Sequence, residues 1–240
     1  MKKIDIHNHI LWGIDDGART KEQSLEMLKI AADHGIAQII ATPHYHYRRG
    51  KADPQTILKK VEELRAAAGE AQIPVQLHAG NELYYTHDLL EELKSGCCLT
   101  LAGTDYVLLE FSLDSDQRRI QNAVYQFLSA GYNPIIAHVE RYEVFHHSRE
   151  ALREISEMGA YFQVNAGSLF GGFHWKRKHF VRSILNEGMV RFLATDAHDP
   201  QKRPPQFGKG DDWFVKKWGD AKSRKVLYEN AQRMLNNQII

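Results

Sequence analysis

Residues that can bind metal ions stand where apolar stretches of the chain end. Seven stretches have the length of strands, and six of them finish in or beside a histidine, a glutamate or an aspartate. The residues at these ends are His7, His9, His44, Glu82, Glu110, His138, Asp196 and His198. Because the carboxyl ends of parallel barrel strands meet at one face, ligands this remote in sequence can converge in space. The pattern predicts a metalloenzyme with its site at that face.

Short β-type stretches alternate with longer helical segments along the whole chain, which is typical of parallel βα units. The predicted strands are Lys3–His7, Ala37–Thr42, Val75–Gly80, Tyr106–Phe111, Pro134–His138, Tyr161–Val164 and Val190–Thr195. The predicted helices are Lys21–His34, Pro54–Ala71, Asp116–Ala130, Ser148–Met158, Lys176–Asn186 and Ala221–Leu235. This order predicts an α/β fold, a (β/α)7 barrel one unit short of the usual eight. The irregular segment Pro200–Gly219 is predicted to be a loop over the barrel mouth.

The composition favours one domain over residues 1–240. A chain of 240 residues, 43% hydrophobic and 25% charged, is long enough for a single α/β barrel. The 31 basic and 30 acidic side chains nearly balance, so neither nucleic acid nor an acidic membrane is expected as a partner. We see no signal peptide, membrane span or disulfide framework, and the only cysteines are the adjacent Cys97 and Cys98. We therefore expect a cytoplasmic protein without membrane insertion.

Each candidate ligand also has a simpler explanation. His7 and His9 could point to one side of a strand and bind one ion, or they could be exposed loop histidines. Asp16, in an Asp-Asp-Gly turn, could be a solvated turn carboxylate. Glu82 and Glu110 follow apolar strands, where a buried carboxylate without a partner is costly. A salt bridge would satisfy any one of them, but coincidence does not explain the whole series.

The ligand types indicate which ions could bind. Imidazoles and carboxylates, without a thiolate, suit manganese, iron or zinc better than soft metals. Eight or nine ligands exceed the needs of one ion, so we expect two or three divalent ions and a bridging carboxylate. His46 is a less secure ligand than His44, because it lies deeper in a basic stretch.

Two arginines follow strands that carry ligands. Arg141 stands three residues after His138, and Arg203 stands five after His198. Arginine beside a metal cluster supplies a fixed pair of donors for phosphate oxygens. Ordinary surface charge is the alternative, but their position favours a phosphate ester as the bound group.

The ordered motifs resemble those of the polymerase and histidinol phosphatase (PHP) superfamily. Within it, they are most similar to the bacterial manganese-dependent protein-tyrosine phosphatases of capsule and exopolysaccharide gene clusters. The motifs are His-x-His, Asp-Gly, Thr-Pro-His, Gly-Asn-Glu, Glu-Phe, His-Val-Glu-Arg-Tyr and Asp-Ala-His; they span residues 7–198, and the match runs on to Arg203. Val139 departs from the proline that relatives commonly carry, but it is not a ligand.

This resemblance implies a distorted, TIM-like (β/α)7 barrel with three metal ions at the carboxyl ends of its strands. Mn²⁺ is the expected ion, with iron and zinc as alternatives. The implied sites are His7, His9, Glu82 and Asp196 for the first ion, Glu82, Glu110 and His138 for the second, and Asp16, His44 and His198 for the third. In such relatives the substrate is a phosphotyrosine on the tail of a bacterial tyrosine kinase that regulates capsular or exopolysaccharide synthesis. The oligomeric state stays open.

The expected reaction is direct attack of metal-bound hydroxide on phosphorus, without a covalent enzyme intermediate. Arg141 and Arg203 would stabilise charge on the phosphoryl oxygens. Asp16 or His198 could protonate the leaving phenolate, although a phenol pKa of about 10 makes this help less necessary. Cysteine chemistry is excluded, because no arginine ends the loop that follows Cys98.

Other functions share part of this pattern. A small-molecule phosphatase of the histidinol-phosphate type would use the same metals on a different substrate. A non-catalytic metal-binding module that docks on a kinase would have no need of Asp16, Arg141 and Arg203. A PHP-type nuclease is disfavoured by the balanced charge.

Overall fold

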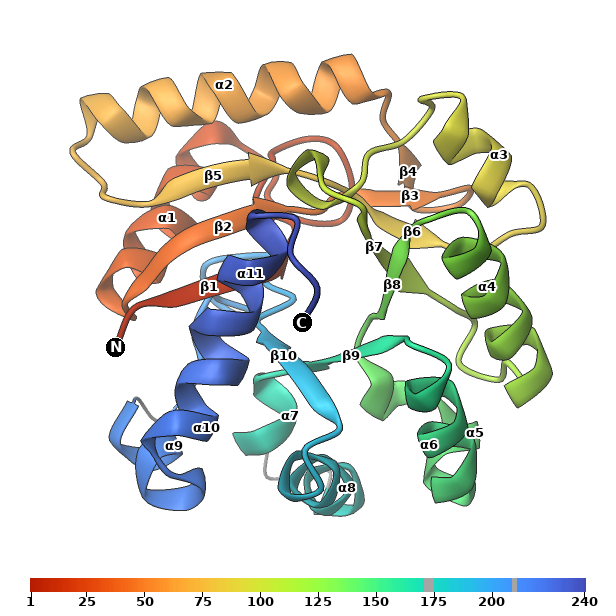
Figure 1. Cartoon of the computed structure of the whole chain (residues 1–240). Helices are drawn as coiled ribbons and strands as arrows, with labels where there is room; N and C mark the ends of the chain where they lie inside the picture. The colour runs from red at the N-terminus through yellow and green to blue at the C-terminus, as the bar shows by residue number, and fades with distance from the viewer. Residues whose placement is uncertain (171–174, 209–210) are drawn as a thin grey trace.

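The strands form a ring of parallel neighbours (Figure 1). In the computed structural model, which describes residues 1–170, 175–208 and 211–240, a first sheet has the order β1-β2-β5 and a second has the order β10-β9-β8-β7-β6-β3-β4. The strand bounds are β1 Lys3–Asn8, β2 Ile36–Ala41, β3 His44–His46, β4 Gly50–Lys51, β5 Gln76–Ala79, β6 Glu82–Tyr84, β7 Tyr106–Glu110, β8 Asn133–Ile136, β9 Tyr161–Asn165 and β10 Val190–Ala194. All pairings are parallel except that of β3 with β4, which form a hairpin. The predicted α/β barrel is confirmed.

Two positions in the ring are interrupted strands. β2 continues into β3 after residues 42–43, and β5 continues into β6 after residues 80–81. The two breaks lie side by side, since Asn81 Nδ2 donates to the Pro43 carbonyl at 2.9 Å and Gly80 N donates to the Ala41 carbonyl at 2.9 Å. A side chain at Gly80 would be tightly placed, because a Cβ there would lie 3.2 Å from Ile40 and 3.1 Å from Leu101. With each interrupted pair taken as one strand, the described residues form seven parallel positions, as the sequence predicts.

The ring closes between β1 and β10. Asp196 N donates to the His7 carbonyl and His9 N to the Ala197 carbonyl, both at 2.9 Å. Below these bonds, the buried Asp5 carboxylate accepts hydrogen bonds from Thr195 N at 2.9 Å and from Asn8 Nδ2 at 2.8 Å. Burial raises the pKa of Asp5, while these hydrogen bonds act in the opposite direction. One buried side chain therefore joins the first strand to the last.

The apolar residues form an inner and an outer core. The inner core fills the barrel and comprises Ile4, Ile6, Ile40, Leu101, Tyr106, Leu108, Ile135, Ala137, Phe192, Ala194, Ala231 and Met234. Ala231 and Met234 come from the C-terminal helix, which crosses the end of the barrel that faces the viewer in Figure 1. The outer core lies between the strands and the surrounding helices. Because side chains alternate along β7, Tyr106, Leu108 and Glu110 share the inner face, which brings Glu110 to the mouth.

The helices follow the predicted segments. The long ones are α1 Lys21–Asp33, α2 Pro54–Glu70, α4 Gln117–Ser129, α6 Arg149–Glu157, α8 Trp175–Asn186 and the C-terminal run of α10 Asp220–Arg224, the π-helical η3 Lys225–Glu229 and α11 Asn230–Leu235. Side-chain caps begin four of them, at Thr20, Asp53, Asp116 and Ser148. The sequence did not predict the shorter elements α3 Leu89–Lys94, η1 Leu101–Gly103, η2 Val139–Arg141, α5 Glu143–His147, α7 Gly167–Phe170 and α9 Asp211–Trp218.

The loop predicted over Pro200–Gly219 is only partly correct. Residues 209–210 lie outside the described residues, and α9 occupies the following part of the segment. The ring centroid of Trp213 lies 4.7 Å from that of Phe170 and 5.2 Å from that of Trp218. The helix α9 itself contains neither glycine nor proline, and this aromatic packing stabilises it against the rest of the protein.

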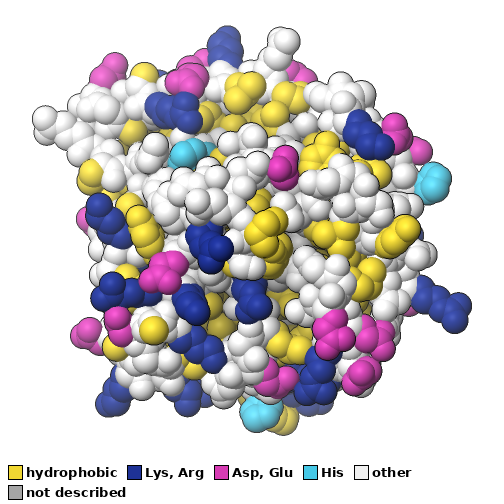
Figure 2. Space-filling model, in the orientation of Figure 1, with side chains coloured by type: hydrophobic (Ala, Val, Ile, Leu, Met, Phe, Trp, Pro, Cys, Tyr) yellow, Lys and Arg dark blue, Asp and Glu magenta, His cyan; other side chains and the backbone are white. Residues whose placement is uncertain are grey.

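The surface in the orientation of Figure 1 carries interspersed acidic and basic side chains (Figure 2). Histidines are sparse on this face, although the chain has 13 of them. In the parts of the chain that the structure describes, no helix combines the length and the apolar character needed to cross a bilayer.

Asp5→Ala is expected to lower the free energy of unfolding by about 3 kcal/mol, because Thr195 N and Asn8 Nδ2 would lose their buried acceptor. Urea denaturation of the metal-free protein measures this change. Asp33→Ala, at the exposed end of α1, is the matched control and should change it by less than about 0.5 kcal/mol. Equal effects of the two substitutions would contradict a role of Asp5 in closing the ring.

Candidate metal centre

The predicted ligand residues lie together at the mouth of the barrel. Three groups each offer ligand atoms within 4.8 Å of one another: His9, Asp16, His44 and His198; His7, His9 and Glu82; and His44, Glu82 and Glu110. All of these side chains are buried except that of Asp16, which is 56% exposed. The groups share members, so they form one continuous centre rather than separate sites.

Glu82 lies at the middle of this centre. Its carboxylate oxygens lie 2.8 Å from His44 Nδ1 and 2.9 Å from His138 Nε2. They also lie 3.3 Å from the Nε2 atoms of His7 and His9. Burial opposes ionisation, but the surrounding imidazoles outweigh it and hold the pKa of Glu82 well below its usual range. A carboxylate in this position can bridge two ions.

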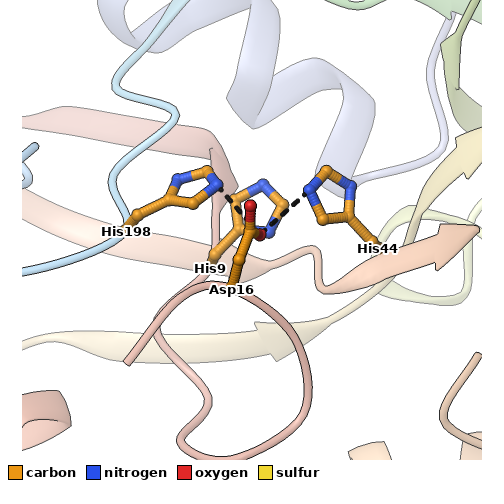
Figure 3. Close-up of side chains that lie close together, drawn as sticks. All are labelled: His9, Asp16, His44 and His198. Carbon is orange, nitrogen blue, oxygen red and sulfur yellow. Dashed lines mark ion pairs between the residues drawn. The ribbon is translucent and has the colours of Figure 1, made fainter. Parts of the chain in front are cut away.

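Asp16 projects from the turn after β1 between two histidines (Figure 3). Its Oδ1 lies 3.2 Å from His44 Nε2 and 3.4 Å from His198 Nε2. Contacts with His198 and then His44 hold the pKa of Asp16 well below its usual range. The turn itself needs Gly17, because a Cβ there would lie 2.1 Å from the His9 carbonyl oxygen.

The two aspartates of this turn make different contacts. The neighbouring Asp15 is buried, and its Oδ2 lies 2.8 Å from His9 Nδ1 and accepts a hydrogen bond from His44 N at 2.9 Å. A carboxylate on Nδ1 leaves the Nε2 lone pair of His9 free to bind a metal ion. The sequence predicts Asp16 as a ligand but gives no role to the adjacent Asp15.

Asp196 connects the ligands with the two predicted phosphate-binding arginines. Its Oδ1 lies 3.5 Å from the Nε2 atoms of His7 and His9. Its Oδ2 accepts hydrogen bonds from Arg141 Nη2 at 2.8 Å and lies 2.7 Å from Arg203 Nη2. Both arginine side chains stay partly exposed, at 30% and 41%. They are thus anchored on the centre by one nitrogen each, while part of each side chain stays accessible to solvent.

β9 is the strand for which no ligand is predicted, and its side chains hold ligand residues of other segments in place. On β9, Gln163 Oε1 accepts a hydrogen bond from His138 N at 2.7 Å and lies 3.2 Å from His7 Nδ1. Gln163 Nε2 donates to Asn165 Oδ1 at 2.8 Å, and Asn165 Nδ2 donates to Asp196 Oδ2 at 2.6 Å. The two amides therefore orient the side chains of His7 and Asp196, while Gln163 also accepts from the peptide of His138. The sequence does not identify Gln163 or Asn165 as functional residues. The only signal it offers is a polar residue inside an otherwise apolar strand.

Two ligand residues adopt left-handed backbone conformations. His138 has φ 33° and Asp196 has φ 52°, values that are uncommon for residues other than glycine. Each residue stands two positions beyond the end of a strand, β8 at Ile136 and β10 at Ala194. Local backbone strain of this kind concentrates at functional sites.

Buried polar atoms in the centre fit a metal-binding role. His44 Nδ1 and Nε2, Glu82 Oε2, Glu110 Oε2 and His138 Nδ1 make no well-aligned hydrogen bond in the described structure, although His44 Nδ1 and Nε2 lie 2.8 and 3.2 Å from the carboxylates of Glu82 and Asp16. Buried polar groups without partners are costly, and divalent cations would satisfy carboxylate and imidazole lone pairs together. These residues therefore fit divalent ions.

The groups differ from the partition implied by the family resemblance. His9 and His44 each belong to two groups, whereas the resemblance assigns each to one ion. His138 is in none of the three groups, although its Nε2 lies beside Glu82. His46 is also outside them, and its Nδ1 accepts a hydrogen bond from Arg48 N at 2.9 Å.

The chain matches a known family over almost its whole length. Residues 3–236 match the family model described as capsular polysaccharide synthesis, CpsB/CapC. The tyrosine-protein phosphatase CpsB of Streptococcus agalactiae is 33% identical over 242 residues, which cover 99% of this chain and all of that protein. The tyrosine-protein phosphatase YwqE of Bacillus subtilis is 33% identical over 239 residues, which cover 99% of this chain and 93% of that protein.

The comparison with solved structures agrees with the family match. A structure from work on YwqE of Bacillus subtilis and CpsB of Streptococcus pneumoniae, described as unique metal-dependent tyrosine phosphatases, superposes with a TM-score of 0.92 at 32% identity. The match covers 99% of this chain and 96% of that one. Histidinol phosphate phosphatase of Lactococcus lactis, complexed with zinc, L-histidinol and phosphate, has a TM-score of 0.59 at 17% identity, over 98% of this chain and 93% of that one. That second likeness concerns the fold alone.

Gln163→Leu is expected to weaken Mn²⁺ binding by about 10- to 100-fold, because His7 and the His138 peptide would lose their common acceptor. Titration calorimetry measures the dissociation constant. Gln163→Glu keeps the acceptor and should recover most of the affinity. Gln38→Leu is the control, since Gln38 Oε1 lies 3.0 Å from a histidine nitrogen outside the centre, that of His78. Equal losses in both leucine variants would indicate general destabilisation.

Metal affinity is also expected to rise with pH. Burial lowers the pKa of His44, but the carboxylates of Glu82 and Asp16 outweigh it and raise the pKa to about 9. Burial and repulsion from Glu82 raise the pKa of Glu110 to about 7. Both raised values mean that protons compete with metal ions until the pH exceeds them. Mn²⁺ affinity should therefore increase by at least about tenfold from pH 6 to pH 9.

Equilibrium titrations followed by electron paramagnetic resonance of free Mn²⁺ measure this dependence under anaerobic conditions. Glu110→Gln should remove the part of the rise near pH 7 and keep the part near pH 9. An affinity that is constant over the whole range would contradict the assignment of these two ligands.

Proposed function

Because the chain belongs to the CpsB/CapC family of capsular polysaccharide synthesis, we propose that it is a metal-dependent protein-tyrosine phosphatase. The observation that carries this proposal is the continuous centre of imidazoles and carboxylates around Glu82, with two arginines anchored on one of its carboxylates. Relatives at 33% identity over the full chain are named tyrosine-protein phosphatases. We assign residues 1–240 to one catalytic domain.

We assign the bound metals to two or three divalent ions, most simply Mn²⁺, with iron and zinc as alternatives. The residues that would hold them are His7, His9, Asp16, His44, Glu82, Glu110, His138, Asp196 and His198. When bound, such ions supply Lewis-acid stabilisation of phosphoryl charge and lower the pKa of water. No thiolate lies among the ligands, which agrees with this choice of metals.

The arginines provide the phosphate-binding part of the mechanism. Asp196 holds one nitrogen of Arg141 and one of Arg203, so each guanidinium is positioned before the substrate arrives. Their remaining donors can bind the non-bridging oxygens of a phosphoryl group in pairs. Since the two are fixed in advance, they can stabilise developing charge with little reorganisation.

The leaving group needs little assistance. A phenolate with a pKa of about 10 leaves more readily than an alkoxide. Asp16, which is 56% exposed, and His198, whose Nε2 lies 3.4 Å from Asp16 Oδ1, are the candidates for donating a proton. Histidine contacts hold the pKa of Asp16 well below its usual range, and burial lowers the pKa of His198, so neither group is favoured as a strong acid and the good leaving group matters more. The mechanism has no covalent step on the protein.

Cysteine chemistry does not compete with this mechanism. Burial, together with nearby acidic groups, raises the pKa of the Cys98 thiol to about 12, so the nucleophilic thiolate is scarce at neutral pH. The exposed Cys97 lies beside Ser95, on the loop after α3, and in none of the ligand groups.

We further infer that the substrate is a phosphotyrosine on the tail of a bacterial tyrosine kinase that controls capsular or exopolysaccharide synthesis, and that the reaction takes place in the cytoplasm. The family description supports the link to capsular polysaccharide synthesis and the names of the relatives support phosphotyrosine as the group hydrolysed, while the kinase tail and the cytoplasm are our own inference. A histidinol-phosphate type of activity has weaker support, because the likeness to the Lactococcus lactis enzyme is one of fold.

The decisive experiment is hydrolysis of an autophosphorylated bacterial tyrosine kinase by the Mn²⁺-loaded protein. Phosphate release should fall by at least about 100-fold after removal of the metal with a chelator and return when Mn²⁺ is added. The double variant Cys97→Ser/Cys98→Ser should keep wild-type turnover, since neither thiol takes part. Metal-independent turnover, or loss of turnover in the folded double variant, would contradict the metal mechanism.

Histidinol phosphate serves as the competing substrate in the same assay. A higher kcat/KM for histidinol phosphate than for a phosphotyrosine peptide would replace the proposed substrate. Binding of Mn²⁺ without release of phosphate from either substrate would support the non-catalytic metal-binding module instead.

A further inference from the structure

A group of aromatic side chains lies one step beyond the metal ligands on two neighbouring strands. His44 on β3 pairs in register with Glu82 on β6, and β7 lies beside β6 with Tyr84 opposite Glu110. Side chains two residues apart on a strand share a face, so His46 follows His44 and Tyr84 follows Glu82 toward the solvent side of the mouth. Tyr45 and Leu83, between them, point outward into the outer core.

These side chains make an ordered wall. The ring centroid of His46 lies 4.2 Å from that of Tyr84, with the planes near perpendicular at 65°. Tyr47, in the turn after β3, stacks on His46 at 4.7 Å with an interplanar angle of 13°. The centroids of Tyr47 and Tyr84 lie 5.9 Å apart. We call His46, Tyr47 and Tyr84 the aromatic wall.

The wall is accessible beside the centre. Tyr47 is 60% exposed although its ring is stacked, whereas His46 is buried at 7%. The turn that carries Tyr47 is held at the centre, because Arg49 Nη1 lies 3.4 Å from Glu110 Oε1. The guanidinium carbon of Arg48 lies 5.2 Å from the Tyr47 ring centroid, a distance at which cation–π attraction helps to fix an exposed ring.

The wall and the arginines lie on different sides of the ring. β3 and β6 are neighbours, while Arg203 follows β10 and contacts Asp196, and Arg141 follows β8 (Figure 1). A phosphoryl group bound by the metal ligands and the arginines would therefore extend its ester substituent along the centre toward the opposite side, where the wall stands. An aryl substituent can stack there, but an alkyl substituent gains much less from an aromatic surface.

We propose that the aromatic wall, with Tyr47 as its exposed member, is the specificity determinant that makes the centre select aryl phosphate esters, and thus phosphotyrosine, over alkyl phosphate esters. This inference rests on the proposed phosphatase function and adds the residues that recognise the substituent. Tyr47 acts by contact with the aryl ring and takes no part in metal binding.

The test compares binding of phenylphosphonate and methylphosphonate to the Mn²⁺-loaded protein by calorimetry. Both ligands present the same phosphoryl-like group and resist hydrolysis, so only the substituent differs. The wild-type protein should bind phenylphosphonate more tightly. Tyr47→Leu should weaken phenylphosphonate binding by about three- to tenfold and change methylphosphonate binding by less than about twofold.

Two variants separate stacking from general effects of substitution. Tyr47→Phe keeps the ring and should bind both phosphonates as the wild type does. Tyr125→Leu is the matched control, because Tyr125 is 67% exposed on α4, away from the mouth. On a phosphotyrosine peptide, Tyr47→Leu should raise KM by a similar three- to tenfold factor, about the range expected for one aromatic contact, and leave kcat within about twofold.

Three outcomes would overturn the proposal: wild-type binding that is no tighter for phenylphosphonate, equal weakening of both phosphonates in Tyr47→Leu, or equal effects of Tyr47→Leu and Tyr125→Leu. Binding of neither phosphonate to the metal-loaded wild type would instead contradict the phosphatase function, and this inference with it.

Discussion

The mouth of the barrel is organised around the cost of burying the carboxylate of Glu82. A buried carboxylate is tolerable only with positive or hydrogen-bonding partners, and here imidazoles approach it from β1, β3 and the turn after β8. No single strand could supply partners in these directions. The ring of parallel strands supplies them together, and its closure between β1 and β10 adds Asp196. The closed ring of strands is therefore also what brings the ligands of the centre together.

The irregular positions of the barrel also help to place partners around Glu82. β2 and β5 break at adjacent points, and the short strands that follow place His44 and Glu82 opposite each other in register. At the other side of the mouth, His138 and Asp196 leave their strands with positive φ. Regular strands and regular turns would direct these side chains differently. The irregular positions of this fold are thus concentrated among the residues that face one another in the centre.

Much of this arrangement could be predicted from the sequence, because strands buried on both faces and capped amphipathic helices have strong local patterns. The ligands could be identified because they end such strands. Residues that act through neighbours could not be identified in that way. Asp15 is distinguished from Asp16 only by where the folded turn directs each side chain. Gln163 and Asn165 acquire partners from distant segments, and a single sequence holds no local signal of those contacts. The helix α9 was missed because its packing on Phe170 depends on tertiary structure.

The amides of β9 have an electrostatic consequence for association with a substrate. Gln163 and Asn165 fix the directions of His7 and Asp196 without adding charge. Carboxylates in their place would orient the same groups but would make the metal-free mouth, which already holds Glu82, Glu110, Asp16 and Asp196, more negative. A phosphate ester approaches as an anion, and a cleft of one sign repels ligands of that sign over distances comparable to the Debye length. Asp15 already orients His9 with a carboxylate, so the neutral amides of β9 hold His7 and Asp196 without adding further negative charge where an anionic substrate enters.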